Sequence, residues 1–217
     1  MTITSSATAW MRRGYAHMNR GAILAETGGD PVEEFRAAAA DLGKALELNP
    51  TLADAWFRLG RTQWIRGVHH HRSGEDPYEW FRDAVAAFDR ALRLDARKTS
   101  AWAARGTAHG FAAVWINSRG GDPEAEFAAG ERDFREAVRL NPSDAEIWSD
   151  WGVMTGNRAN TLESAGKDSR EMRDAAVEQL GEAVRHNPQS ASAWCKHAGA
   201  IGNVARVLAA RKGDPTE

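Results

Sequence analysis

The chain has 217 residues, of which 42% are hydrophobic and 27% are charged, and its formal net charge is −2 at pH 7. This composition is typical of a folded protein, and the slight acidic excess argues against a nucleic-acid-binding protein, because such proteins usually carry a strong basic excess. Cys195 is the only cysteine, so a disulfide within the chain and a cysteine-based zinc site are excluded.

Five tryptophans recur at a fixed interval of 46 residues: Trp10, Trp56, Trp102, Trp148 and Trp194. A landmark at constant spacing over a whole chain indicates a repeat array. The repeats span about residues 5–50, 51–96, 97–142 and 143–188, followed by a half repeat, 189–217, and we expect them to form a single domain, 1–217. We also expect all five tryptophans to be buried between successive repeats.

The first repeat contains the pattern of two helices. Apolar and small residues at helical spacing predict a helix over about residues 7–26, which a Thr-Gly-Gly turn ends. Asp30 and Pro31 then begin a second helix, because Asp is a good N-cap and Pro is favoured at the first helical position. Glu33 is spaced to bond back to the cap as in a capping box. An Asn-Pro pair ends this helix.

The same landmarks return in the later repeats without insertion or deletion. An Asp precedes each second helix, at Asp30, Asp76, Asp122 and Asp168, and a glycine follows four of the tryptophans, at Gly14, Gly60, Gly106 and Gly152. A glycine inside a helix costs roughly 1 kcal/mol relative to alanine, which is tolerable where a neighbouring helix passes close by. We therefore expect an all-α fold of antiparallel helical hairpins that stack on one another.

These columns match a known family. Residues Trp10, Gly14, Ala38, Leu42, Ala45 and Pro50 fall on the tetratricopeptide repeat pattern if 12 residues are inserted between Gly14 and Ala38. Over about residues 5–212, the chain resembles a tetratricopeptide repeat (TPR) protein with elongated repeats. The resemblance implies a right-handed superhelical solenoid of about four and a half repeats. It also implies a non-catalytic scaffold that presents a concave groove to a peptide or helix of a partner protein.

In this family the first helix of each hairpin lines the groove. The resemblance assigns the groove to Met11, Tyr15, Met18, Phe57, Arg61, Trp64, Ile65, Phe111, Asn157 and Asn203. An amphipathic helix or extended peptide would place an apolar anchor near Trp64 and its polar end near the asparagines. Alternatively, the elongated helices pack these residues against one another and close the groove, since apolar stripes at helical spacing are usually core.

No catalytic, cofactor or metal site is expected. Consecutive histidines at residues 69–71 point about 100° apart on a helix and cannot bind one metal together. The recurrent Asp residues are explained as caps, and no nucleophile is paired with a base. Cys195 is expected to be a small apolar filler.

A second hypothesis is self-association. Residues 192–211 carry an apolar pattern, and the given sequence contains no second helix to cover it, whereas terminal repeats normally need a polar outer face. Either the sequence is cut from a longer array, or this surface contacts another copy of the chain. No apolar run is long enough for a membrane helix, and residues 1–9 lack a signal-peptide pattern. We therefore expect a cytoplasmic protein whose partners are proteins or peptides, including a second copy, rather than membranes or nucleic acids.

Overall fold

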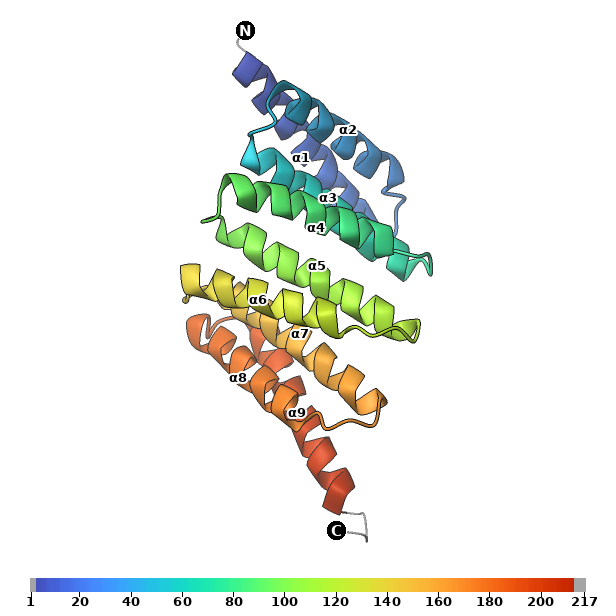
Figure 1. Ribbon diagram of the computed structural model, residues 1–217, viewed down its shortest axis with the longest axis vertical. Helices are drawn as coiled ribbons and strands as arrows, with labels where there is room; N and C mark the ends of the chain where they lie inside the picture. The colour runs from blue at the N-terminus through green and yellow to red at the C-terminus, as the bar shows by residue number, and fades with distance from the viewer. Residues whose placement is uncertain (1–2, 213–217) are drawn as a thin grey trace. The chain divides into compact units, whose positions relative to one another are not determined.

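The computed structural model describes residues 3–212, and every regular element in that range is an α-helix (Figure 1). By its internal contacts the chain divides into two compact units, Met1–Ala108 and His109–Glu217, and helix α5 contributes to both. The helices are α1 (Ile3–Thr27), α2 (Val32–Leu48), α3 (Ala53–Arg72), α4 (Tyr78–Leu94), α5 (Thr99–Ser118), α6 (Glu124–Leu140), α7 (Ala145–Ser164), α8 (Arg170–His186) and α9 (Ala191–Lys212).

The predicted all-α fold of helical hairpins is confirmed. In the first unit, α1 pairs with α2 and α3 with α4, and α2 also packs on α3. In the second unit, α7 pairs with α8, and α9 packs on α8 and α7. The last residues of the predicted half repeat, 213–217, lie outside the described residues. None of the described helices is long and apolar enough to cross a membrane.

The predicted caps are present at the start of each second helix. Asp30 Oδ1 accepts a hydrogen bond of 3.0 Å from the backbone N–H of Val32, and the equivalent Asp makes the same bond in the three later repeats. The capping-box prediction is wrong for Glu33, because its carboxylate instead accepts a hydrogen bond of 2.7 Å from Arg36. A basic residue one helical turn away competes for that carboxylate.

The turn inside each hairpin depends on a glycine that the sequence reading did not treat as a repeating column. Gly28, Gly74, Gly120 and Gly166 have φ between 67° and 81°. This left-handed conformation ends a helix and favours glycine. The residue after each glycine donates its N–H back to the helix, as in the bond of 2.8 Å from Gly29 to Leu24 O.

The glycine four residues after the tryptophan lets the second helix of the hairpin pass close by, as predicted. A methyl group at this position would lie 2.6–2.9 Å from a large side chain of the second helix, in the pairs Gly14–Leu42, Gly60–Phe88 and Gly152–Leu180. Seven residues further on, Gly21 and Gly67 meet Phe35 and Phe81 in the same way, at 2.7 and 2.6 Å. Each of these hairpins is therefore held by small residues of the first helix facing large residues of the second.

The tryptophans do not have the predicted burial. The first four are half-buried, and the side chain of Trp194 is 51% exposed. In the last four repeats the indole N–H donates a hydrogen bond of 2.8–3.0 Å to the carbonyl oxygen six residues earlier, for example from Trp148 to Pro142. A buried indole must satisfy its N–H. Each of these rings accordingly lies beside the loop that precedes its own helix, and small residues such as Ala55 and Ala101 fill the interior.

Candidate functional site

Two of the ten predicted groove residues are core residues. Met18 is 1% exposed, and Met11 is 8% exposed and packs in a cluster with Leu42, Ala45 and Leu46. Their burial removes them from any surface that a partner protein would contact.

Three other predicted residues line a hollow in the first unit. Arg61, Trp64 and Ile65 of α3 face Ala22 and Ala25 of α1 across a hollow of about 230 Å³, which we call the α1–α3 hollow. The two helices that line it, α1 and α3, pack against each other. The side chains are half-buried, so each has one part against the protein and another part available to a ligand.

The two predicted aromatic residues of α3, Phe57 and Trp64, are half-buried because they pack against neighbouring residues. Phe57 and Trp64 lie against the cluster formed by Ala84, Phe88 and Ala108. The Phe57 ring centroid is 5.8 Å from that of Phe88, at an interplanar angle of 47°. Phe57 and Trp64 therefore pack on their neighbours and also keep part of their surface exposed.

Tyr15 lies half-buried on α1 under a positive charge. The guanidinium carbon of Arg58 is 3.9 Å from the Tyr15 ring centroid, a cation–π geometry. A hydrogen bond with Asn19, together with Arg58 and the charge of Arg61, lowers the pKa of Tyr15. The charges around this ring favour acceptor or anionic groups on a ligand.

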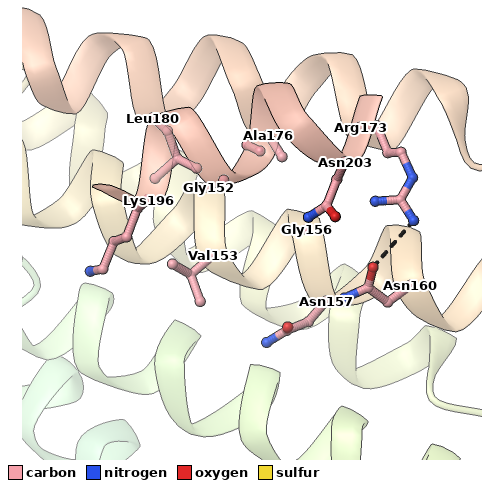
Figure 2. Close-up of a pocket in the computed structure, with 12 residues that line it drawn as sticks. Gly152, Val153, Gly156, Asn157, Asn160, Arg173, Ala176, Leu180, Lys196 and Asn203 are labelled. Carbon is pink, nitrogen blue, oxygen red and sulfur yellow. Dashed lines mark hydrogen bonds between the residues drawn. The ribbon is translucent and has the colours of Figure 1, made fainter. Parts of the chain in front are cut away.

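The second unit contains a separate pocket of about 240 Å³ between α7, α8 and α9, which we call the α7–α9 pocket (Figure 2). The predicted residues Asn157 and Asn203 both line it, and Asn160, Arg173 and Lys196 add further polar groups. Figure 2 shows Lys196 at one end of the pocket and the asparagines and Arg173 at the other, with aliphatic residues such as Val153 and Leu180 between them. The structure thus brings together the two asparagines that were assigned from separate repeats.

A network of charged groups holds this pocket in shape. Arg173 is 4% exposed, donates a hydrogen bond of 3.2 Å to Asn160 Oδ1 and forms an ion pair with Glu163. Arg206 of α9 reaches the same carboxylate at 3.2 Å. On the other side, Lys196 Nζ donates a hydrogen bond of 2.8 Å to Ser149 Oγ. These contacts attach α9 to the α7–α8 hairpin.

Two glycines keep the α7–α9 pocket open. Gly156 and Gly199 both line it, and a methyl group added at either position would meet nothing within 4 Å. The same pocket contains Gly152, where a methyl group would lie 2.6 Å from Leu180 Cγ. The pocket is therefore open beside Gly156 and Gly199, because no neighbouring side chain fills the space next to them.

One carboxyl group near this pocket is electrostatically perturbed. Burial raises the pKa of Asp150 to about 6, and the negative charges of Glu146 and Asp144 add to the increase, while Lys196 opposes it. Burial disfavours the charged form of an acid, which is the direction seen here.

The remaining predicted residues have other surroundings. Phe111 belongs to the second unit and is half-buried on α5. The expectation that Cys195 fills the core is wrong, because its side chain is exposed. In the histidine run, the His70 ring stacks on Trp80 with centroids 5.4 Å apart, and His70 Nδ1 is hydrogen-bonded to the Glu75 carboxylate. The described residues contain no group of three His, Cys, Asp or Glu side chains suited to a metal.

The recurring helical hairpins place this chain in the class of helical repeat proteins. Among solved structures, the crystal structure of the MamA protein is similar, with 18% identity over 95% of this chain and 88% of that chain, at a TM-score of 0.58. The fold is that of a tetratricopeptide repeat protein.

Two further solved structures of TPR proteins are less similar. A thermophilic TPR protein of Thermus thermophilus has 18% identity, covering 87% of this chain and 98% of that chain at a TM-score of 0.46. YrrB, a TPR protein described as having an unusual peptide-binding site, has 18% identity, covering 82% and 88% of the two chains at a TM-score of 0.39. No protein-family model matches the sequence, and the search of curated proteins gives no match.

Proposed function

We propose that the protein is a non-catalytic protein–protein interaction scaffold that presents its first-helix surfaces to a peptide or helix of a partner. The observation that carries this proposal is the pair of open hollows on a repeated framework. The framework columns are constant, whereas the residues that line the α1–α3 hollow differ from those that line the α7–α9 pocket. Concave surfaces with a few convergent polar groups are the usual places for ligand binding.

The two hollows suit different chemical groups of a ligand. The α1–α3 hollow offers the aromatic face of Trp64 beside the charge of Arg61, which suits an apolar side chain next to an acidic one. The α7–α9 pocket offers amide groups from Asn157, Asn160 and Asn203, which pair well with the N–H and C=O groups of a peptide backbone. Each hollow is proposed as a binding surface in its own right.

The α7–α9 pocket is tested by filling it without disturbing the fold. Gly199→Leu places a side chain in the pocket at a position with free space, and Gly202→Leu is the matched control on the same helix, since it also has free space but does not line the pocket. The wild type and both variants serve as bait in quantitative affinity purification from a lysate of the source cells. A partner retained by the wild type and by Gly202→Leu, but lost with Gly199→Leu, supports the proposal. Equal recovery by all three contradicts it for this pocket.

The α1–α3 hollow is tested separately by charge reversal. Arg61→Glu changes a residue that lines it, and Arg12→Glu makes the same change at an exposed position of α1 outside it. We expect loss of the partner only with Arg61→Glu. If neither change alters recovery, this hollow is not a binding surface.

Self-association through the half repeat is a second candidate. It is favoured by the exposed apolar side chains of α9, namely Trp194, Ile201 and Leu208, at 51, 49 and 51%. Static light scattering at two protein concentrations tests it. A mass that rises with concentration supports an assembly role, and a constant monomer mass at the highest concentration contradicts it.

A further inference from the structure

Arg173 of the α7–α9 pocket stands where the other complete hairpins have a buried phenylalanine. The equivalent residues of the earlier repeats are Phe35, Phe81 and Phe127, each at most 1% exposed. Arg173 is buried as well, at 4%. A buried guanidinium costs stability compared with an apolar core residue, and exceptions of this kind are expected at functional sites. Arg173 is therefore a candidate for binding a ligand.

A neighbour of Arg173 is also polar in this repeat alone. Asn160, whose Oδ1 accepts the bond of 3.2 Å from Arg173, stands where the earlier repeats have apolar residues: Ala22, Val68 and Val114. Arg173 and Asn160 both line the pocket. The fourth hairpin thus replaces apolar framework residues with a hydrogen-bonded polar pair at the pocket wall.

The hydrogen bonds of this pair leave donor groups for a ligand. Nη2 of Arg173 donates to both Asn160 and Glu163, while its buried Nε has no hydrogen-bond partner among the described residues. A guanidinium contains only donors, so the amide of Asn160 must turn its oxygen to Arg173 and keeps its NH2 group for a ligand. Figure 2 shows Asn157 and Asn203 at the same end of the pocket. An acceptor group of a ligand suits this end.

The charge at this end favours a carboxylate. Arg173 and Arg206 both pair with Glu163, so two positive charges share one negative charge. At the other end of the pocket, the charge of Lys196 is offset by the nearby carboxyl group of Asp150. The one positive charge left beside Arg173 matches a group with a single negative charge, and a guanidinium pairs strongly with a carboxylate.

The middle of the pocket is apolar and open. Gly156 stands at the repeat position of Met18 and Trp64, and a methyl group added there would meet nothing within 4 Å. Val153 is 39% exposed and lies with Leu180 between the two polar ends (Figure 2). An apolar side chain of the ligand, placed beside its carboxylate, would cover Val153 and gain by leaving water.

A further helix packed on α9 would not close this pocket. Its three helices correspond to α1, α2 and α3 of the first unit, where the next helix, α4, contacts α3 but, within the described residues, neither α1 nor α2. A helix that followed α9 in the same way would contact α9 and leave the α7 and α8 walls of the pocket free.

We propose that the Arg173 end of the α7–α9 pocket binds the carboxylate of an aspartate or glutamate side chain within a partner polypeptide, and that a neighbouring apolar side chain of that polypeptide lies on Val153 and Leu180. The carboxylate accepts hydrogen bonds from Arg173 and from the NH2 group of Asn160. This proposal rests on the scaffold function proposed above and names the chemical group that the pocket selects.

Short peptides test the proposal on the intact protein. The probe is acetyl-Ala-Asp-Ala-Leu-Ala-amide, or the same peptide with Glu in place of Asp. In an extended peptide, the acidic and Leu side chains lie on one side, about 6.7 Å apart. Heteronuclear NMR follows the side-chain N–H signals of Arg173 and of the pocket asparagines during titration. We expect saturable shifts with an acidic peptide and at least about 10-fold weaker binding of the peptide with Asn in place of Asp.

Protein variants locate the site. Arg173→Phe installs the residue of the earlier hairpins, and Asn160→Asp replaces the NH2 donor with a negative charge at an exposed position. Each should weaken binding of the acidic peptide about 10-fold or more. Gln189→Glu changes an exposed amide to a carboxylate outside the pocket and should leave binding unchanged. Circular dichroism verifies folding, and Asn160→Asp tests the site even if Arg173→Phe does not fold.

Several results would overturn the proposal. They are the absence of saturable shifts with both acidic peptides, equal binding of the Asn peptide, and unchanged binding to Asn160→Asp. Two more peptides compare other anions: the Asn peptide with a free C-terminal carboxylate, and the probe with phosphoserine in place of Asp. Tighter binding of either one would overturn the assignment to an acidic side chain. A partner that is lost with Gly199→Leu but retained by Asn160→Asp would refute the carboxylate and leave the scaffold function standing.

Discussion

The close approach between helices makes a sharp prediction for two glycines on one helix. Gly152 and Gly156 lie four residues apart on α7 and both line the α7–α9 pocket. A methyl group at Gly152 would lie 2.6 Å from Cγ and 3.2 Å from the backbone nitrogen of Leu180, which is 3% exposed, whereas at Gly156 it would meet nothing within 4 Å. Either alanine gains roughly 1 kcal/mol of helix propensity. Only Gly152→Ala also introduces overpacking, which costs about 1–3 kcal/mol.

The propensity gain cancels when the two variants are compared, which leaves the steric cost. Gly156→Ala should be the more stable of the two by about 1–3 kcal/mol, or between about 2 and 12 °C in melting temperature for a protein of this size. Thermal melts followed by circular dichroism measure this difference. Because repeat arrays can unfold in stages, hydrogen exchange of the α8 amides provides a local measurement. Equal melting temperatures and equal α8 protection for the two variants would refute the close-approach explanation of the glycine column.

Three further predictions concern the second unit. Trp148→Phe removes the N–H that bonds to the Pro142 carbonyl at 2.8 Å and should cost about 1 kcal/mol in urea unfolding; an unchanged midpoint would show that the bond contributes nothing. In the folded protein the pKa of Asp150 is raised from 3.8 to about 6. Ionised Asp150 therefore opposes folding above pH 6, and the protonated group does not oppose it below pH 4. Asp150→Asn should stabilise the protein at pH 7 by at most about 3 kcal/mol, and an equal gain at pH 4 would contradict this. Arg173→Ala should destabilise the protein by about 1–3 kcal/mol, because a carboxylate loses its buried partner, and Arg206→Ala by less than about 0.5 kcal/mol because that side chain is 58% exposed; equal losses would contradict the importance of burial.

The fold could be predicted because its determinants are local and repeated. The Asp-Pro start and the Asn-Pro end each fix the backbone within a few residues, and the period repeats these signals along the chain. The Gly28 column was missed as a repeat because a glycine in a turn is compatible with several turn types, and its φ of 81° is visible only in the structure.

The candidate site was less predictable because burial depends on packing between helices. Met18 and Trp64 occupy the same repeat position, yet Met18 is 1% exposed and Trp64 is half-buried beside a hollow. Sequence spacing assigns both to one face of a first helix, but the neighbouring side chains decide how much of that face is covered. The tryptophans show the same effect, since a hydrogen-bonding requirement at the indole N–H places them beside a loop.

The two contacts between the helices of a hairpin follow one antiparallel register, and that register is centred on the turn. In the first hairpin, Gly14 faces Leu42 and Gly21 faces Phe35, and the midpoint of both pairs is Gly28, the residue with the left-handed conformation. The two contacts are seven residues apart on each helix, or about 10 Å at 1.5 Å per residue. Insertion of one residue into the turn would shift both large side chains away from both glycines at once. This coupling explains why the repeats keep a constant length, and it explains how hairpins longer than those of an ordinary TPR remain closely packed along their length.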